Sequence, residues 1–193
     1  MGLRGARRGV RGPQALLVLS LTVLSCCASR PPPETAAEDD SLVLRTVLEG
    51  ETVGHEVVVR LDAPPAEVEA WLLDFDHIAA DRPNVLEAAL VRRDGDAWIA
   101  RFTFRGSLGI DPTAVTRTTR HRDGDVVVLR FRAIETSFGL SDLHGHYRLE
   151  PDGPAGTRLE HRLFVGTPFV TEEGRRRDLL EDARAVLARF GAR

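Results

Sequence analysis

The sequence predicts an α+β domain in which a curved antiparallel sheet of about seven strands wraps around one long C-terminal helix. Three observations lead to this fold class. Apolar residues recur at every second position through most of the chain, which is the spacing of half-buried strands. Short turn signals containing Asp-Gly divide these stretches into hairpins. The last segment, residues 172–190, changes to helical spacing, with the apolar stripe Leu179, Ala183, Val186, Leu187 and Phe190.

One strand and two short helices precede the hairpins. His55–Leu61 is rich in β-branched residues and is predicted as a strand; residues 46–52 either add an earlier strand or lengthen this one. Asp62-Ala63-Pro64-Pro65 then opens a helix, because proline is favoured in the first turn. Its apolar stripe is Val68, Trp71, Leu72 and Phe75. A second helix over residues 77–81 ends before Arg82-Pro83, since a residue before proline disfavours helix.

Three hairpins supply the other six strands: residues 86–93 with 97–105, residues 113–122 with 126–134, and residues 142–150 with 157–165. In the first hairpin, a turn at Asp94-Gly95 places Ala89 opposite Ala100 and Val91 opposite Trp98. This register puts Glu87 opposite Phe102, on the inner side of the sheet. The outer side carries arginines interleaved with acids, as is typical of a solvated face: Arg101, Arg105, Arg130, Arg132, Arg148, Arg158 and Arg162.

A strongly curved sheet that holds one helix leaves a cavity between the two. Strand alternation assigns eight residues to its wall as candidate ligand-binding residues: Trp98, Phe102, Phe104, Leu129, Phe131, Tyr147, His161 and Leu163. Residues 106–112 and 136–140 join consecutive strands at one end of the sheet and contain glycine and large apolar residues. They either form a flexible mouth or tuck into the core.

The third hairpin contains three histidines that could hold a metal ion only in one register. Pairing Leu149 with Leu159 keeps an apolar inner face and turns His161 inward beside Tyr147, with His144 and His146 outward. A register that brings His146 opposite His161 would mix polar and apolar residues on both faces. We therefore predict no metal site and no cofactor. The inward His161 and Tyr147 either satisfy each other or meet a ligand oxygen.

Several short motifs resemble those of the START-like, or SRPBCC, superfamily, which includes polyketide cyclases and coenzyme Q-binding proteins. The matching segments are residues 62–68, 73–76, 83–85, 145–151 and 156–159. The resemblance implies the helix-grip fold. It also implies a cavity for a hydrophobic ligand such as a lipid, sterol, quinone or polyketide, on which a minority of members catalyse a reaction. Fold alone does not establish function.

The N-terminus has the features of an export signal. Arg4, Arg7, Arg8 and Arg11 precede an apolar run over residues 15–24, which is shorter than the roughly 20 residues that span a bilayer. Val23-Leu24-Ser25-Cys26 resembles the bacterial lipobox, whose cysteine is acylated; an ordinary secretory signal or an uncleaved anchor is the alternative. The expected organisation is a signal peptide over residues 1–25, a lipid-anchored flexible linker over residues 26–41 and one ligand-binding domain over residues 42–193.

Cysteine and charge exclude several classes of function. Both cysteines, Cys26 and Cys27, lie at the processing point, so the mature domain has no disulfide, Cys-based zinc site or thiol nucleophile. Loss of the four N-terminal arginines leaves 22 basic residues against 29 acidic ones, a net charge of −7. An acidic domain of this kind is a poor nucleic-acid binder.

We therefore expect a lipoprotein that binds a hydrophobic small molecule and contacts a membrane through its N-terminal lipid. Its expected location is the bacterial cell envelope, at the outer membrane facing the periplasm, because Ala28 at the second position after Cys26 is not the aspartate of an inner-membrane retention signal. One alternative is a cyclase- or dehydratase-type enzyme that uses His161 with Tyr147 or Glu87. Another is an envelope interaction protein whose cavity is filled by side chains. The oligomeric state stays open.

Overall fold

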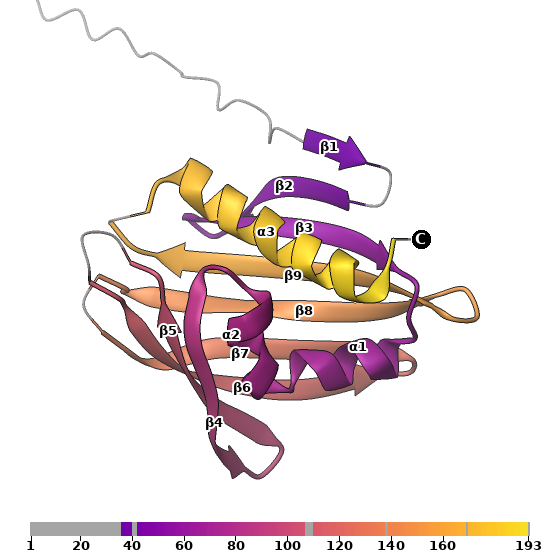
Figure 1. The fold of residues 1–193 in the computed structure, drawn as a ribbon, viewed down its shortest axis with the longest axis horizontal. Coiled ribbons are helices and arrows are strands. Elements are labelled where there is room, and N and C mark those ends of the chain that lie inside the picture. Colours follow the sequence, from indigo (N-terminus) through magenta and orange to yellow (C-terminus); the bar gives the residue numbers. More distant parts are fainter. Residues whose placement is uncertain (1–35, 40–41, 107–109, 138, 169, 193) are drawn as a thin grey trace, which may run out of the picture. The chain divides into compact units, whose positions relative to one another are not determined.

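The computed structural model describes residues 36–39, 42–106, 110–137, 139–168 and 170–192, which form one antiparallel sheet and three helices (Figure 1). The order of strands in the sheet is β1-β2-β3-β9-β8-β7-β6-β5-β4. The strands are β1 (Ala36–Asp39), β2 (Leu42–Glu49), β3 (Thr52–Leu61), β4 (Val85–Asp94), β5 (Ala97–Phe104), β6 (Thr113–Asp123), β7 (Val126–Thr136), β8 (Asp142–Asp152) and β9 (Gly156–Gly166). The helices are α1 (Pro65–Leu72), α2 (Phe75–Asp81) and α3 (Glu172–Phe190). This arrangement confirms the predicted helix-grip architecture of the α+β class.

The sheet extends beyond the seven predicted strands because β2 precedes β3. Residues 46–52 proved to belong mostly to this earlier strand, which turns at Gly50 and pairs with β3 along its whole length. Leu42 and Leu44 are buried, so β2 adds to the core. Of the predicted linker, the structure describes residues 36–39, which form β1 beside β2. Residues 1–35, including Cys26 and the predicted signal peptide, lie outside the described residues.

The predicted register of the first hairpin was wrong. The turn consists of Gly95 and Asp96, so that Arg93 lies opposite Trp98, and Gly95 adopts a positive φ of 57°. This turn displaces the pairing by two residues, and a bulge between Leu90 and Arg92 then brings it back by one. Leu90 therefore lies opposite Ala100, and Val91 is exposed.

The same shift moves Glu87 out of the interior. It lies opposite Thr103 and is exposed, while Ala88 takes the place opposite Phe102. A one-residue change of register sends a side chain to the other face of the sheet. Glu87 is thus not a candidate acid or base for the cavity.

The third hairpin has the predicted register. Leu149 lies opposite Leu159, and Tyr147 lies opposite His161 on the inner face. His146 on the outer face has its Nε2 atom 3.2 Å from Oε1 of Glu160. Among the described residues, no three histidine, cysteine, aspartate or glutamate side chains are grouped as metal ligands.

Three helices, and not the last one alone, cover the inner face of the sheet. Helix α3 contacts β2 and β3, α1 contacts β8 and β9, and α2 contacts β4. The bounds of α3 match the predicted ones; Thr171 caps it by accepting a hydrogen bond from the backbone N of Gly174 at 3.1 Å. Helix α2 begins at Phe75, two residues before the predicted start, so Phe75 belongs to α2 and not to the stripe of α1.

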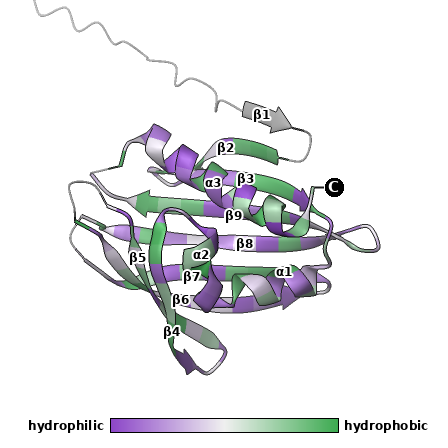
Figure 2. Cartoon of the chain, in the orientation of Figure 1, coloured by the Kyte–Doolittle hydropathy of each residue, from purple (hydrophilic) through white to green (hydrophobic). Residues whose placement is uncertain are grey.

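The main core lies between α1, α3 and the inner face of β2, β3, β7, β8 and β9, and includes the fully buried Leu61, Val68, Leu149 and Leu179. Figure 2 shows the corresponding alternation of hydrophobic and hydrophilic residues along the strands and the mixture of both kinds along α3. In the described part of the chain, we find no helix with the length and apolar character needed to cross a bilayer.

Candidate functional site

A cavity of about 190 Å³ lies between the inner face of β5 to β9 and the helices α2 and α3. Its wall is mostly apolar, because strand alternation sends one residue in two of each strand toward the helices. Leu72, Phe75 and Ile78 of α1 and α2 close it from one side, and Leu143 and Val165 of the third hairpin from the other.

The structure brings seven of the eight predicted wall residues to this cavity: Phe102, Phe104, Leu129, Phe131, Tyr147, His161 and Leu163. Trp98 points inward but does not line the cavity: it is buried in an apolar cluster with Val85 and Ala100 and borders a second, open pocket. Its cross-strand partner Thr118 does line the cavity. Strand alternation predicts the face of a residue and not which neighbours cover its side chain.

A buried polar cluster lies on the cavity wall. Arg82, at the C-terminal end of α2, donates a hydrogen bond from Nη1 to the hydroxyl of Tyr147 at 3.1 Å. The same Nη1 lies 3.5 Å from Oδ2 of Asp182 on α3. Because Arg82 links one helix, the sheet and the other helix, it holds a positive charge at a defined place in an apolar cavity.

Sequence reasoning did not identify Arg82 or Asp182. The sequence around Arg82 indicates only that a helix ends there before Pro83. The sequence does contain a sign that Asp182 is buried: it lies beside Ala183 and one turn after Leu179, within the apolar stripe of α3. An acid inside an apolar helical stripe requires a buried partner, and the partner here is Arg82.

Tyr147 and His161 stack with ring centroids 4.2 Å apart and an interplanar angle of 28°. The ring of Phe131 lies 5.5 Å from that of Tyr147. Gly145 makes room for this arrangement, because a Cβ atom there would lie 2.8 Å from the Phe131 ring and 2.0 Å from the backbone O of Arg162. The tyrosine hydroxyl is therefore directed to Arg82, while the imidazole faces the cavity beside it.

Burial determines the protonation states in this cluster. It lowers the pKa of His161 well below its usual value, with the positive charge of Arg82 and the imidazole of His146 acting in the same direction, so the imidazole is neutral at pH 7. Burial raises the pKa of Tyr147, against the opposing effect of Arg82, which keeps the phenol protonated. Burial also raises the pKa of Asp182, although Arg82 opposes this shift.

Arg82 keeps its charge despite its burial. Burial alone would lower the pKa of the guanidinium, but the Asp182 carboxylate and the Tyr147 hydroxyl outweigh it and raise the pKa. The cluster thus offers a ligand one cation, one phenol and one neutral imidazole within an apolar wall.

Four buried polar atoms on cavity-lining residues have no hydrogen-bond partner among the described residues: Nε of Arg82, Oδ1 of Asn84, Nε of Arg175 and Oδ1 of Asp182. Leaving one buried polar group unpaired costs about 1–3 kcal/mol. Each such group in a native structure calls for an explanation, such as a functional role or a bound water or ion.

At one end of the sheet, the cavity is bordered by Pro112, Gly139, Leu140, Thr167 and Val170. Leu140 is buried in a small core cluster, whereas Ile110 is 49% exposed. Leu140 therefore belongs to the core, and the mouth expected at this end stays a prediction. Leu108 and Phe138, which belong to the same predicted loops, lie outside the described residues.

Comparison with known proteins gives a family match over most of the domain. The family profile described as polyketide cyclase/dehydrase and lipid transport matches residues 52–193. No curated protein matches the chain at a significant level.

Solved structures of similar fold come from bacteria and from humans. A STAR-related lipid transfer protein from Xanthomonas axonopodis has a TM-score of 0.67 at 14% identity, covering 81% of this chain and 94% of that one. The human StarD13 lipid transfer and protein localization domain has a TM-score of 0.62 at 18% identity, covering 82% and 86%. The Zhui aromatase/cyclase from a Streptomyces species has a TM-score of 0.57 at 19% identity, covering 76% and 93%. At these low sequence identities, the similarity shows a shared fold and nothing more.

Proposed function

Because the chain belongs to the polyketide cyclase/dehydrase and lipid transport family, we propose that it binds an amphiphilic small molecule in the cavity between the sheet and the helices. The observation that carries this proposal is the apolar cavity with the buried cluster of Arg82, Tyr147 and Asp182 on its wall. Apolar walls with a few placed polar groups are typical of small-molecule sites.

The polar cluster narrows the ligand class. A pure hydrocarbon would make no hydrogen bond with the polar side chains of the wall, such as Arg82, Tyr147 and His161. A molecule with an apolar body and an oxygen-bearing group, such as a lipid, quinone or polyketide, would pair with Arg82 or His161. The cavity exceeds the roughly 150 Å³ that holds a benzene molecule in an engineered protein, so it accommodates a ring-sized group, and a longer ligand would extend through the mouth.

Titration of a fluorescent fatty acid or a quinone tests the proposal. Leu163→Asn places an amide on the cavity wall and is expected to weaken binding of the probe. Leu90→Asn is the matched control, because Leu90 is 44% exposed and does not line the cavity. Both variants are first compared by circular dichroism, so that only folded proteins are titrated. Absence of saturable binding by the wild type would contradict the proposal and favour an interaction protein with a filled cavity.

A cyclase- or dehydratase-type enzyme is the second candidate. The observation that favours it is the neutral imidazole of His161 stacked on Tyr147 at the cavity wall, where the pair could exchange a proton with a bound substrate. His161→Gln distinguishes the two functions. A binding protein should lose about tenfold in affinity, whereas an enzyme that uses this imidazole should lose about 10²–10⁴-fold in rate.

We also propose that the domain is exported and tethered to the bacterial outer membrane by acylation of Cys26. The support is the order of basic residues, apolar run and Val23-Leu24-Ser25-Cys26 at the N-terminus. The double substitution Cys26→Ala with Cys27→Ala should abolish incorporation of radiolabelled fatty acid, because no thiol then remains at the processing point, whereas Cys27→Ala alone should keep it. Both cysteines are replaced because Cys26→Ala alone would put a small residue before Cys27 and create a new lipobox there. Incorporation by the double variant would contradict the lipobox assignment, and fractionation to the inner membrane would contradict the location.

A further inference from the structure

A second pocket lies outside the ligand cavity and shares no lining residue with it. It is open to solvent, has a volume of about 470 Å³ and lies between α1 and the strands β4, β5 and β6. Its wall combines Ala66, Ala70 and Leu73 with the charged or aromatic residues Glu69, Asp74, Arg93, Trp98, Arg120 and Arg122. We call this site the arginine pocket.

The three arginines of this pocket lie on the inner face of the sheet. Arg93 is opposite Trp98, Arg120 is opposite Leu129, and Arg122 is opposite Val127. Since Leu129 and Val127 are core residues, the same face that is apolar in the middle of the sheet becomes basic at this end. These three arginines therefore do not belong to the solvated outer face of the sheet.

One buried carboxylate holds two of the arginines in place. Oε1 of Glu69 is 2.9 Å from Nη1 of Arg120, and Oε2 is 2.6 Å from Nη2 of Arg122. The Glu69 side chain is only 6% exposed, whereas those of Arg120 and Arg122 are 43% and 53% exposed. Each guanidinium thus uses one nitrogen to bind the buried acid and keeps further N–H donors at the open pocket.

The third arginine lies against an aromatic ring. The guanidinium carbon of Arg93 is 4.3 Å from the ring centroid of Trp98, and that of Arg120 is 5.8 Å from it. Within the described residues, Arg93 has no carboxylate at ion-pair distance. Asp74, the other acid of the pocket, lies 3.4 Å from Nδ1 of His77 and has a 63% exposed side chain. The pocket therefore holds three cations, of which two share the buried anion Glu69 and the third has no carboxylate partner among the described residues.

From this geometry we infer that the arginine pocket binds a phosphate-type oxyanion. Guanidinium groups bind phosphate oxygens with paired, charge-assisted hydrogen bonds. Glu69 and Trp98 already restrict the three side chains, so little conformational freedom is lost when an anion binds. An anion would also relieve the repulsion among the three like charges. The phosphate could be free or part of a lipid headgroup.

Two arms of one experiment distinguish these sources in the full-length protein. Calorimetric titration with inorganic phosphate, at an ionic strength held constant with sodium chloride, measures binding of the free anion. Co-sedimentation with phosphatidylglycerol vesicles, compared with phosphatidylcholine vesicles, measures binding of a headgroup on an anionic surface. Saturable binding of inorganic phosphate identifies the free anion as the ligand. Sedimentation with the anionic but not with the phosphatidylcholine vesicles identifies the lipid headgroup. Either result supports anion binding at the arginine pocket if the variant described below loses that binding.

Arg93→Gln tests the site without exposing the buried Glu69. We expect this variant to weaken phosphate or vesicle binding by about tenfold, as for a lost charged hydrogen bond. Arg101→Gln, which removes one exposed arginine from the outer face of β5, is the matched control and should bind as the wild type does. Binding in neither arm would overturn the inference. So would equal losses in both variants, because they would show a general charge effect. Retained hydrophobic-probe binding by Arg93→Gln separates this inference from the proposed cavity function.

Discussion

At the scale of single residues, the contact between Arg82 and Asp182 connects the two helices that flank the cavity. Both side chains are about nine-tenths buried, so neither charge is compensated by water. Removing one partner of a buried ion pair lowers the free energy of unfolding by more than the intact pair adds to it, because the other charge stays buried without a partner. The pair is thus a requirement of the fold as well as a feature of the cavity.

Asp182→Asn should lower the free energy of unfolding by about 3–5 kcal/mol, because Arg82 loses its buried anion. Asp178→Asn is the control one turn earlier on α3; its contact with Arg177 is 3.8 Å and the side chain is 32% exposed. The control should cost about 1 kcal/mol or less. Urea denaturation measures both, and equal costs would show that the Arg82 contact has no special importance.

His161 should make stability depend on pH. Its pKa in the folded protein is lower than the value of 6.5 in an unfolded chain, mainly because of burial. Below pH 6.5 the unfolded chain therefore binds a proton that the folded protein resists, and stability falls as the pH decreases towards the lowered pKa. Above pH 6.5 the imidazole is neutral in both states, and its contribution is complete.

Because of this one group, the free energy of unfolding should change by up to about 1.4 kcal/mol per pH unit. His161→Gln should show a shallower loss of stability between pH 7.5 and pH 5 in urea unfolding. Burial lowers the pKa of His55 as well, so part of the dependence should persist in the variant. An unchanged slope would mean that the imidazole is accessible to water in the folded protein.

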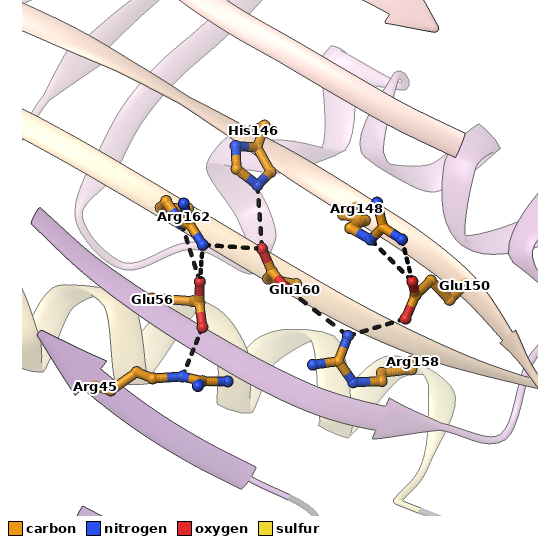
Figure 3. Close-up of polar contacts among 8 residues, drawn as sticks. All are labelled: Arg45, Glu56, His146, Arg148, Glu150, Arg158, Glu160 and Arg162. Carbon is orange, nitrogen blue, oxygen red and sulfur yellow. Dashed lines mark hydrogen bonds and ion pairs between the residues drawn. The ribbon is translucent and has the colours of Figure 1, made fainter. Parts of the chain in front are cut away.

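At the scale of elements, ion pairs on the outer face tie β2, β3, β8 and β9 together (Figure 3). Glu56 of β3 is 2.6 Å from Nε of Arg45 on β2 and accepts a hydrogen bond from Nε of Arg162 on β9 at 2.9 Å. Its side chain is only 3% exposed because the two arginines cover it. Glu150, at the other end of the network, contacts Arg148 and Arg158 but is 28% exposed.

Glu56→Gln should lower the free energy of unfolding by about 2–3 kcal/mol, since charged hydrogen bonds to a buried group are lost. Glu150→Gln removes the same type of contact nearer to solvent and should cost about 1 kcal/mol or less. Thermal or urea unfolding of the two variants gives the comparison. A larger loss for Glu150→Gln would show that burial does not determine the strength of these pairs.

At the scale of the whole molecule, the cavity couples ligand binding to folding. Ligand bound only by the folded protein stabilises it by about 2.7 kcal/mol at a hundredfold excess over Kd. The melting temperature should therefore rise with probe concentration in the wild type. Leu163→Asn should show a much smaller rise than Leu90→Asn at equal probe concentration. Equal rises would place the bound probe elsewhere on the protein.

The amino-acid sequence alone predicted the class of the fold, the three hairpins, the long C-terminal helix and the register of Tyr147 against His161. These features depend on local periodicity and turn residues, which the order of residues contains. It also assigned seven of the eight wall residues to the correct face and region of the sheet. Residues 46–52 by themselves do not decide between an extra strand and a longer one, because a short alternating run fits both.

Only the tertiary structure decided the features that depend on contacts between distant segments. The bulge between Leu90 and Arg92 moved Glu87 out of the interior, because one extra residue in a strand reverses the face of those before it. The contact of Arg82 with Asp182 joins side chains a hundred positions apart in the chain, and no local pattern pairs them. The same holds for the arginine pocket, where α1 brings Glu69 to Arg120 and Arg122 of β6, two arginines that the sequence of that strand alone does not pair with an acid.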